Sequence, residues 1–340
     1  MEILSTVEEV EALLGRPARV VLAKATRVLD DGCRAVLAAA PLAGVGFRDA
    51  EGEPHTTVVG GAIAEPRNRL SFTLPPRTPR PAAPGVSMLF LLVGVGETLR
   101  INGTLVGIDG DRVTIDLDEA YVHCARCVLR SRLWRDGHPA AKVSVPVDGP
   151  LAEPGIAGFL AASPFALLSS WDGDGHGDTS PRGDLPGFLQ VLDGRTLALP
   201  DRRGNRRADT LRNLMSCPAV SLAALVPGRA EVLGLRGTAT VTTDAALLAT
   251  MALQGKAPHA AVTVHVDAAA VEPAPALQTA WNGRPTPGAP DMNAVGAGHL
   301  TAGAGAGTRA LVRAAAGATA GLARRALDVS YRRALRDEGY

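Results

Sequence analysis

Residues 197–218 read LALPDRRGNRRADTLRNLMSCP, and the rest of the chain is interpreted from this stretch. It predicts a short strand, a polar turn and then a helix over about 206–215 with Asn205 as its N-cap. Arg206 and Arg207 would open that helix, where unpaired backbone N–H groups and the helix dipole favour an anion. Because guanidinium groups match phosphate oxygens bidentately, the stretch predicts a phosphate site. An ordinary exposed basic helix start is the alternative.

The composition indicates a globular protein large enough for two domains. The chain has 340 residues, of which 46% are hydrophobic, and 38 Gly and 25 Pro indicate many turns or an unstructured connection. A formal net charge of +1 gives no electrostatic reason to expect nucleic acid or a membrane surface as partner. The acidic start MEILSTVEEVEALL is unlike a secretory signal, and the longest apolar run, 86–96, is too short for a bilayer. We therefore expect a cytoplasmic protein.

Short apolar or alternating runs, separated by Gly, Pro and Asp, follow residue 41 and predict many strands of a barrel or sandwich. The expected strands cover 56–59, 69–74, 87–95, 97–108 and 112–117. Helices are expected after a capping box at Ser5 and Glu8, and over 19–30, 33–40 and 119–134. The predicted class is mainly β with flanking helices.

The chain contains an internal repeat. CRAVLAAAPLAG (33–44) aligns with IAGFLAASPFAL (156–167), and ETLRINGTLVGIDGD (97–111) aligns with EVLGLRGTATVTTD (231–244). The closing Trp134 aligns with Trp281. The spacing between the copies changes in only a few steps, so one fold occurs twice.

The differences between the copies concern the expected site. Where the second copy has the turn and helix of the opening stretch, the first has RTPRPAAPG (77–85), whose three prolines exclude a helix. The second copy has a helical insert near 244–256 that the first lacks. The first copy ends in the polar YVHCARCVLRSRLW (121–134), whereas the second ends in the blunter AVEPAPALQTAW (270–281). The first copy thus lacks the turn and helix of the expected phosphate site, and the second copy lacks the polar end.

These motifs resemble those of the pyridoxamine 5'-phosphate oxidase-like flavoproteins, which have an FMN-binding split β-barrel. In the second half the resemblance is carried by 163–184 and 197–222. In the first half it is carried by 24–41, 97–105 and 121–134. In that family two subunits pair and FMN lies between them. The resemblance therefore implies two fused split β-barrels forming a pseudo-dimer within one chain.

The resemblance also implies a set of FMN-binding residues drawn from both halves. The second half would hold the phosphate and ribityl side through Ser180, Arg182, Asn205, Arg206 and Arg207. The first half would contact the isoalloxazine and substrate side through Arg100, Asn102, Arg130, Ser131 and Trp134. We expect one complete site and about one FMN per chain, with the reciprocal site empty. A buried plug for Trp134 and an exposed helix end for Arg130 and Ser131 are the alternatives.

The expected organisation has four parts. An N-terminal repeat covers 1–148, a C-terminal repeat 149–282, a flexible Gly/Ala/Pro linker 283–308 and a basic amphipathic helix 309–340. We expect this last helix to pack on the body or on a partner.

Cysteine and histidine give no strong signal. Four cysteines in a chain of this size predict no disulfide framework. Cys124-Ala-Arg-Cys127 is either a redox pair or two thiols on one helix face. Histidines 55, 176, 259 and 265 lack metal-ligand spacing, so no metal site is expected.

The predicted function is that of an FMN-dependent oxidoreductase that moves hydride or electrons between the flavin and a small organic substrate. NAD(P)H or a reductase would be the electron donor. No residue stands out as a catalytic acid or base. A deazaflavin- or haem-binding barrel enzyme and a non-catalytic flavin-binding or scaffold protein are the rival hypotheses. The oligomeric state, monomer or further homo-oligomer, stays open.

Overall fold

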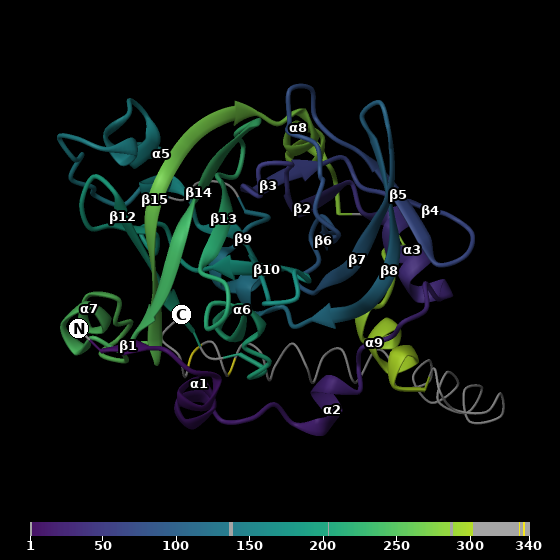
Figure 1. Cartoon of the computed structure of the whole chain (residues 1–340), viewed down its shortest axis with the longest axis horizontal. Coiled ribbons are helices and arrows are strands. Elements are labelled where there is room, and N and C mark those ends of the chain that lie inside the picture. The colour runs from purple at the N-terminus through teal and green to yellow at the C-terminus, as the bar shows by residue number, and fades with distance from the viewer. Residues whose placement is uncertain are drawn as a thin grey trace.

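The computed structural model describes residues 2–135, 139–202, 204–285 and 288–301, together with Arg333 and Arg336. Two curled antiparallel sheets lie side by side, with helices around them (Figure 1). The expected class of two split β-barrels flanked by helices is confirmed. Apart from its two described arginines, the predicted helix over 309–340 lies outside the described residues.

The first repeat forms a seven-stranded sheet in the order β3-β2-β6-β7-β8-β5-β4. Its elements are α2 (Arg19–Leu22), α3 (Asp31–Ala39), β2 (Leu42–Arg48), β3 (Pro54–Val59), β4 (Ile63–Ala64), β5 (Arg69–Thr73), β6 (Gly85–Leu91), β7 (Thr98–Asp109), β8 (Arg112–His123) and α4 (Arg126–Ser131).

The second repeat has the order β10-β9-β13-β14-β15-β12-β11. Its elements are a short 3-10 helix (Pro150–Ala152), α5 (Ile156–Ala162), β9 (Phe165–Trp171), β10 (Gly177–Gly183), β11 (Gln190–Val191), β12 (Thr196–Asp201), α6 (Asp209–Asn213), β13 (Ala219–Leu225), β14 (Glu231–Thr242), α7 (Ala245–Thr250), β15 (Ala260–Pro273) and α8 (Pro275–Asn282).

The internal repeat is confirmed by the identical strand order and by a shared irregularity. Both long hairpins carry a β-bulge at the equivalent place, after Asn102 in one copy and after Arg236 in the other. Glycine follows each, because a Cβ at Gly103 or Gly237 would lie 2.4 Å or 1.9 Å from a carbonyl oxygen of the partner strand. As the sequence predicts, α6 and α7 have no equivalents in the first repeat.

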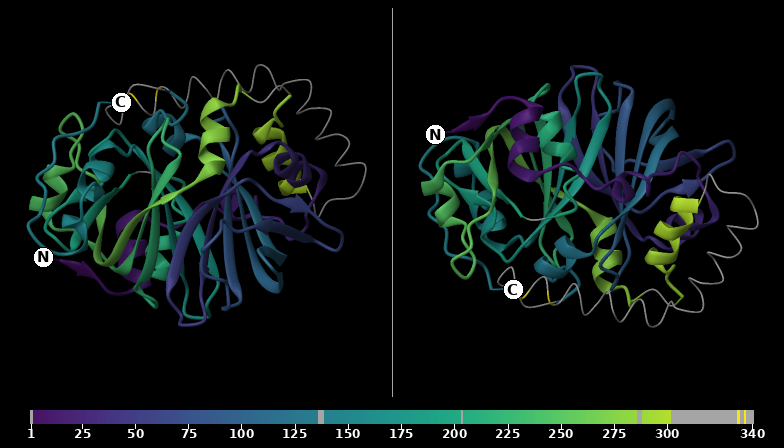
Figure 2. Two further views of the ribbon diagram at one scale, coloured as in Figure 1. Left: turned by 90° about the horizontal axis from the view of Figure 1, so that it is seen from above. Right: turned by 90° about the horizontal axis from the view of Figure 1, so that it is seen from below.

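Each barrel has its own apolar core, and a third cluster joins them. That cluster includes Leu42 and Leu89 from the first repeat and Leu167 and Leu225 from the second, all fully buried. Each buried leucine stabilises the fold by about 1.5–3 kcal/mol. The barrels approach closely at Gly46, where a Cβ would lie 2.2 Å from the Ser169 Oγ. Figure 2 shows the two barrels lying against each other.

The two ends of the described chain pack on the opposite repeats. Strand β1 (Ile3–Leu4) pairs with β14 of the second barrel, and Val10 of α1 (Val7–Leu14) lies in that barrel's core. Helix α9 (Met292–Thr301) instead packs on α3 and β8 of the first barrel. Figure 2 shows this crossed arrangement from two sides. The expected boundaries at 1–148 and 149–282 therefore misplace the first 14 residues.

Within the linker expected over 283–308, residues 292–301 instead form α9, which buries Met292 and Val295; residues 286–287 and 302–308 lie outside the described residues. The Gly/Ala-rich composition of this segment concealed a helix that packing on the first barrel stabilises.

Helix boundaries differ from the predictions in four further places. The opening helix starts after Thr6, whose side chain forms the capping box with Glu9, one residue later than expected. The helix expected over 19–30 is reduced to the single turn of α2, and β8 continues to His123, so the helix expected over 119–134 is only α4. Helix α6 begins at Asp209 rather than at 206, because Ala208 precedes it in the left-handed conformation with φ 53°. None of the described helices is long and apolar enough to cross a bilayer.

Candidate functional site

A cavity of about 480 Å³ lies where the two barrels meet. Its walls come from β7, β8 and α4 of the first repeat, from β10, β12 and α6 of the second, and from α1. Its charged and polar lining comprises Arg100, His123, Arg126, Arg130, Ser180, Arg182, Asp184, Asp201, Arg202, Asn205, Arg206, Arg207, Asp209, Thr210 and His259.

Arg100 crosses from one barrel to the other. Leu99 and Ile101 face the first core, so the alternation of β7 turns Arg100 toward the second repeat. It is 1% exposed, yet it forms ion pairs with Asp178 and Asp209. Its Nη2 also donates to the Ser180 Oγ at 2.8 Å. This buried charge is therefore fully compensated by carboxylates and by a hydroxyl.

Arg207 is held over an aromatic ring. Its Nη2 lies 2.7 Å from Glu119 and its Nε 2.9 Å from Asp209, while the guanidinium carbon is 3.8 Å from the Tyr121 ring centroid. Burial alone would raise the pKa of Asp209, but the charges of Arg100 and Arg207 hold that pKa below its usual value. Asp209 is therefore ionised and links arginines of both repeats.

The phosphate side predicted from the sequence is a loop of arginines. Arg182 on β10 pairs with Asp201 at 2.9 Å, and Arg202 pairs with Asp184 at 2.8 Å. Arg206, at φ 62°, is exposed and has no carboxylate partner among the described residues. Asn205 does not cap α6; its side chain accepts the backbone N–H of Arg207 at 3.1 Å and shapes the loop.

The cavity carries an excess of positive charge and several unused donors. Seven arginines but only three aspartates line it. Among the described residues, the buried Nε atoms of Arg100 and Arg182 have no hydrogen-bond partner, and neither has the buried Nε2 of His123. Because buried polar atoms are normally satisfied, the two arginine Nε donors point to a ligand with acceptor groups. Burial and the charges of Arg100 and Arg207 lower the pKa of His123 well below its usual value, so its ring is neutral.

Most of the residues predicted from the sequence meet at this cavity. Those that line it are Arg100, Arg130, Ser180, Arg182, Asn205, Arg206 and Arg207. Arg130 on α4 donates to the Gly183 carbonyl at 3.1 Å, so it joins the barrels rather than forming an exposed helix end.

Three predicted residues lie elsewhere. Asn102 borders an adjoining cavity of about 560 Å³ and accepts the Ser87 hydroxyl at 2.8 Å. Ser131 is buried and donates to the Val128 carbonyl within its own helix.

Trp134 is the clearest correction, because it lies outside the cavity that the arginines form. Helix α4 ends at Ser131, the next residue Arg132 has φ 48°, and the Trp134 Nε1 donates to the Val95 carbonyl. Its ring lies 5.6 Å from that of Trp281, its counterpart in the repeat. The position of Trp134 is thus closer to the alternative prediction, that of a buried plug, than to a contact with the cofactor.

Sequence reasoning missed the carboxylates. Asp178 lies two residues before Ser180 on β10, so strand alternation could have placed it on the same face. The thiols of the CxxC also border the cavity, and the Cys127 Sγ donates to the Pro181 carbonyl at 3.2 Å. Leu13 and Leu14 from α1 also line the cavity. No local signal in the sequence could predict this, because it depends on the packing of the N-terminal end on the second repeat.

Comparisons with known proteins agree with this architecture. A model of the family described as pyridoxamine 5'-phosphate oxidase matches residues 152–275. The second repeat is therefore similar to this family. The first repeat has the same strand order as the second, and it lacks a counterpart of α6. No curated protein matches the sequence.

Solved structures with this likeness cover about a third of the chain. A single-residue variant of HupZ from Group A Streptococcus is 16% identical over 35% of this chain and 98% of its own, with a TM-score of 0.30. A Clostridium acetobutylicum protein related to general stress protein 26 is 12% identical over 34% of this chain and 84% of its own, with a TM-score of 0.28. HutZ, described as the haem storage protein from Vibrio cholerae, is 16% identical over 36% and 93%, with a TM-score of 0.26.

Proposed function

We propose that the cavity binds one FMN per chain and that the protein is a flavin-dependent oxidoreductase. The observation that carries the proposal is the excess of arginines over carboxylates in a cavity that both barrels line. Its volume of about 480 Å³ is within the range of cofactor sites, which is roughly 300–1,000 Å³. When bound, FMN would supply hydride or electron transfer to a small organic substrate.

The phosphate would bind at the Arg182 and Arg206 side of the cavity. Arg206 has no carboxylate to displace, and the free Nε of Arg182 can donate while its Nη1 keeps the pair with Asp201. The Ser180 hydroxyl lies beside them on β10. Asp201 and Asp184 hold arginines in place before the anion arrives, which reduces the entropy lost on binding.

The side of the cavity formed by the first repeat would contact the flavin ring. Arg130 is fixed there by the Gly183 carbonyl and supplies a positive charge, which would stabilise a reduced anionic ring. Neutral His123 and the thiols of Cys124 and Cys127 complete that wall. Arg100 and Arg207 are already bound by carboxylates, so their main role would be to position the wall, and the Nε of Arg100 would be the one donor of this pair left for the ligand.

The deciding experiment is an absorption spectrum of the purified protein with mass identification and stoichiometry of the cofactor. We expect about one FMN per chain. Replacing Arg182 and Arg206 together by Ala should empty the site, because each charge-assisted hydrogen bond contributes roughly 1.5–3 kcal/mol. Arg195→Ala, on an exposed turn outside the cavity, is the matched control. Full flavin content in the double variant would contradict the phosphate assignment.

Haem is the second candidate, and one observation favours it. His123 lines the cavity as a neutral histidine whose Nε2 has no partner among the described residues, and such a nitrogen could hold the haem iron. The arginines would then bind the haem propionates. A Soret band that is lost in His123→Ala would establish haem, whereas a flavin spectrum retained in that variant would exclude this role. Bound flavin that neither NAD(P)H nor dithionite reduces would favour a non-catalytic module.

A further inference from the structure

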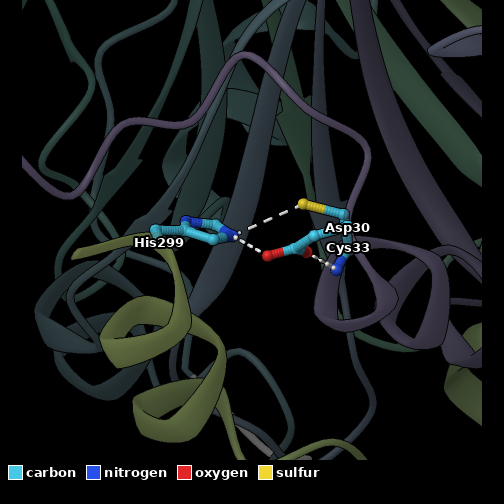
Figure 3. Close-up of side chains that lie close together, drawn as sticks. All are labelled: Asp30, Cys33 and His299. Carbon is cyan, nitrogen blue, oxygen red and sulfur yellow. Dashed lines mark hydrogen bonds and ion pairs between the residues drawn. The ribbon is translucent and has the colours of Figure 1, made fainter. Parts of the chain in front are cut away.

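A second cluster of reactive side chains lies outside the cofactor cavity, where the crossed C-terminal end meets the first barrel. Asp30 and Cys33 stand at the start of α3, and His299 comes from α9 (Figure 3). The potential ligand atoms of all three lie within 4.8 Å of one another. Cys33 and the His299 side chain are fully buried, while the Asp30 side chain is 30% exposed.

Two of the three side chains, those of Asp30 and His299, are oriented by a hydrogen bond that leaves one ligand atom available. The His299 Nδ1 lies 3.1 Å from the Lys24 carbonyl, so Nδ1 carries the proton and Nε2 presents its lone pair to the cluster. The Asp30 Oδ1 accepts the Cys33 N–H at 2.8 Å, which leaves Oδ2 for the cluster. A backbone carbonyl that holds the second nitrogen of a histidine is the usual support of a metal ligand.

The spacing fits a tetrahedral ion. The His299 Nε2 lies 3.5 Å from the Cys33 Sγ and 3.7 Å from the Asp30 Oδ2. Ligands bound to zinc at usual bond lengths lie about 3.3–3.6 Å apart along the edges of a tetrahedron. These two distances are within a few tenths of an ångström of that range, and the third pair, the Cys33 Sγ and an Asp30 carboxylate oxygen, lies within 4.8 Å.

We propose that Asp30, Cys33 and His299 bind a Zn²⁺ ion that fastens α9 to the first barrel. Thiolate, imidazole and carboxylate together are a zinc donor set, and water can reach the fourth position through the exposed side of Asp30. The site closes a loop between residues far apart in sequence, and it is independent of the cofactor proposed for the arginine-lined cavity. The alternative is a plain hydrogen bond from the Cys33 thiol to the His299 ring.

The test is zinc content per chain after dialysis against metal-free buffer. It is made in a His176→Ala background, because the exposed group Asp172, Asp174 and His176 offers a competing site. We expect one tightly bound zinc per chain. Cys33→Ala and His299→Ala should each lower the zinc affinity by about 100-fold or more, because each variant removes one of only three protein ligands. The matched controls Cys217→Ala and His265→Ala should keep the ion.

Asp30→Asn separates metal binding from helix capping. Asparagine caps a helix as well as aspartate does, so α3 should keep its stability while the carboxylate ligand is lost. We expect weaker zinc binding at an unchanged apo-protein melting temperature. Co²⁺ in place of zinc should give a thiolate charge-transfer band that disappears in Cys33→Ala. Absence of zinc from the parent protein, or zinc retained in both the Cys33 and His299 variants, would overturn the proposal.

Discussion

Arg100 is a fully charged side chain in a place that water scarcely reaches. It lies between Asp178 and Asp209, and Tyr121 lies below it with a ring centroid 4.9 Å from the guanidinium carbon. Burying an ion pair costs desolvation energy that the pairing only offsets, so such a pair specifies an arrangement more than it stabilises it. Here the arrangement is the position of the first barrel against the second.

We expect Arg100→Met to destabilise the protein by about 3–5 kcal/mol, because Asp178 would remain as an unpaired buried charge. Chemical denaturation would measure the change in the free energy of unfolding. The double variant with Asp178→Asn should recover part of the loss. Arg236→Met, which breaks an exposed pair with Glu53, should cost no more than about 1 kcal/mol. Equal losses in Arg100→Met and Arg236→Met would contradict the role of burial.

His123 makes a second prediction at the residue scale. Its folded pKa lies well below the unfolded value of about 6.5, so the unfolded chain binds the proton more readily. The contribution of the neutral His123 ring to the free energy of unfolding is therefore complete above about pH 6.5, and it decreases as the pH falls below this value. The free energy of unfolding should decline over this range in the parent protein and less steeply in His123→Gln. An identical slope in both proteins would show that the ring is not held neutral, with exposed His265→Gln as control.

Helix α6 is the element on which the site depends, and its first turn begins from a strained residue. Ala208 precedes it with φ 53°, a conformation that costs a residue with a Cβ roughly 1–2 kcal/mol. This turn brings Asp209 between the two arginines instead of continuing a helix through Arg206.

We therefore expect Ala208→Gly to stabilise the protein, by about 0.5–1 kcal/mol after the extra flexibility of the unfolded chain is counted. The same substitution in a regular exposed turn, Ala246→Gly in α7, should destabilise by about 1 kcal/mol. Melting temperatures of the two variants would check the opposite signs. Destabilisation of both would show that position 208 is not strained.

The strands and the repeat could be predicted from the sequence because apolar alternation and punctuation by glycine and proline are local signals. The start of α6 could not be predicted, because nothing in the sequence around Ala208 indicates a residue in the left-handed conformation. Within the site, Ser180, Arg182 and Arg207 were found from a motif. The contacts of Ser180 with Arg100 and of Arg207 with Glu119 could not be found in this way, because they depend on the packing of two barrels. Trp134 was misplaced because its partner is its own repeat counterpart, Trp281.

At the scale of the whole molecule, the cavity exists only while the barrels are in contact. The contact is close at Gly46, where the Cβ of any side chain would meet the Ser169 and Thr179 hydroxyls within 2.6 Å. The same strand region carries buried hydroxyl bonds between the repeats, such as Thr56 to Ser169 at 2.8 Å. The interface therefore leaves no room for an added side chain.

Gly46→Val should cost at least about 1–3 kcal/mol through overpacking and should also lower cofactor content, because both barrels line the cavity. Gly107→Val on the open end of β7, where a Cβ meets nothing within 4 Å, is the matched control and should be neutral. Denaturation and cofactor stoichiometry would report the two effects separately. A normal cofactor content per chain in a destabilised Gly46 variant would show that cofactor binding does not depend on this contact between the barrels, which would contradict the prediction.

The crossed ends have a consequence for how the protein is made. Strand β1 is synthesised before either barrel, yet its partner residues Val241 and Thr242 follow more than two hundred positions later. The first barrel likewise waits for α9, which is synthesised after the whole second barrel. Neither barrel can reach its final form during translation before the other has been produced, so the two halves must mature together.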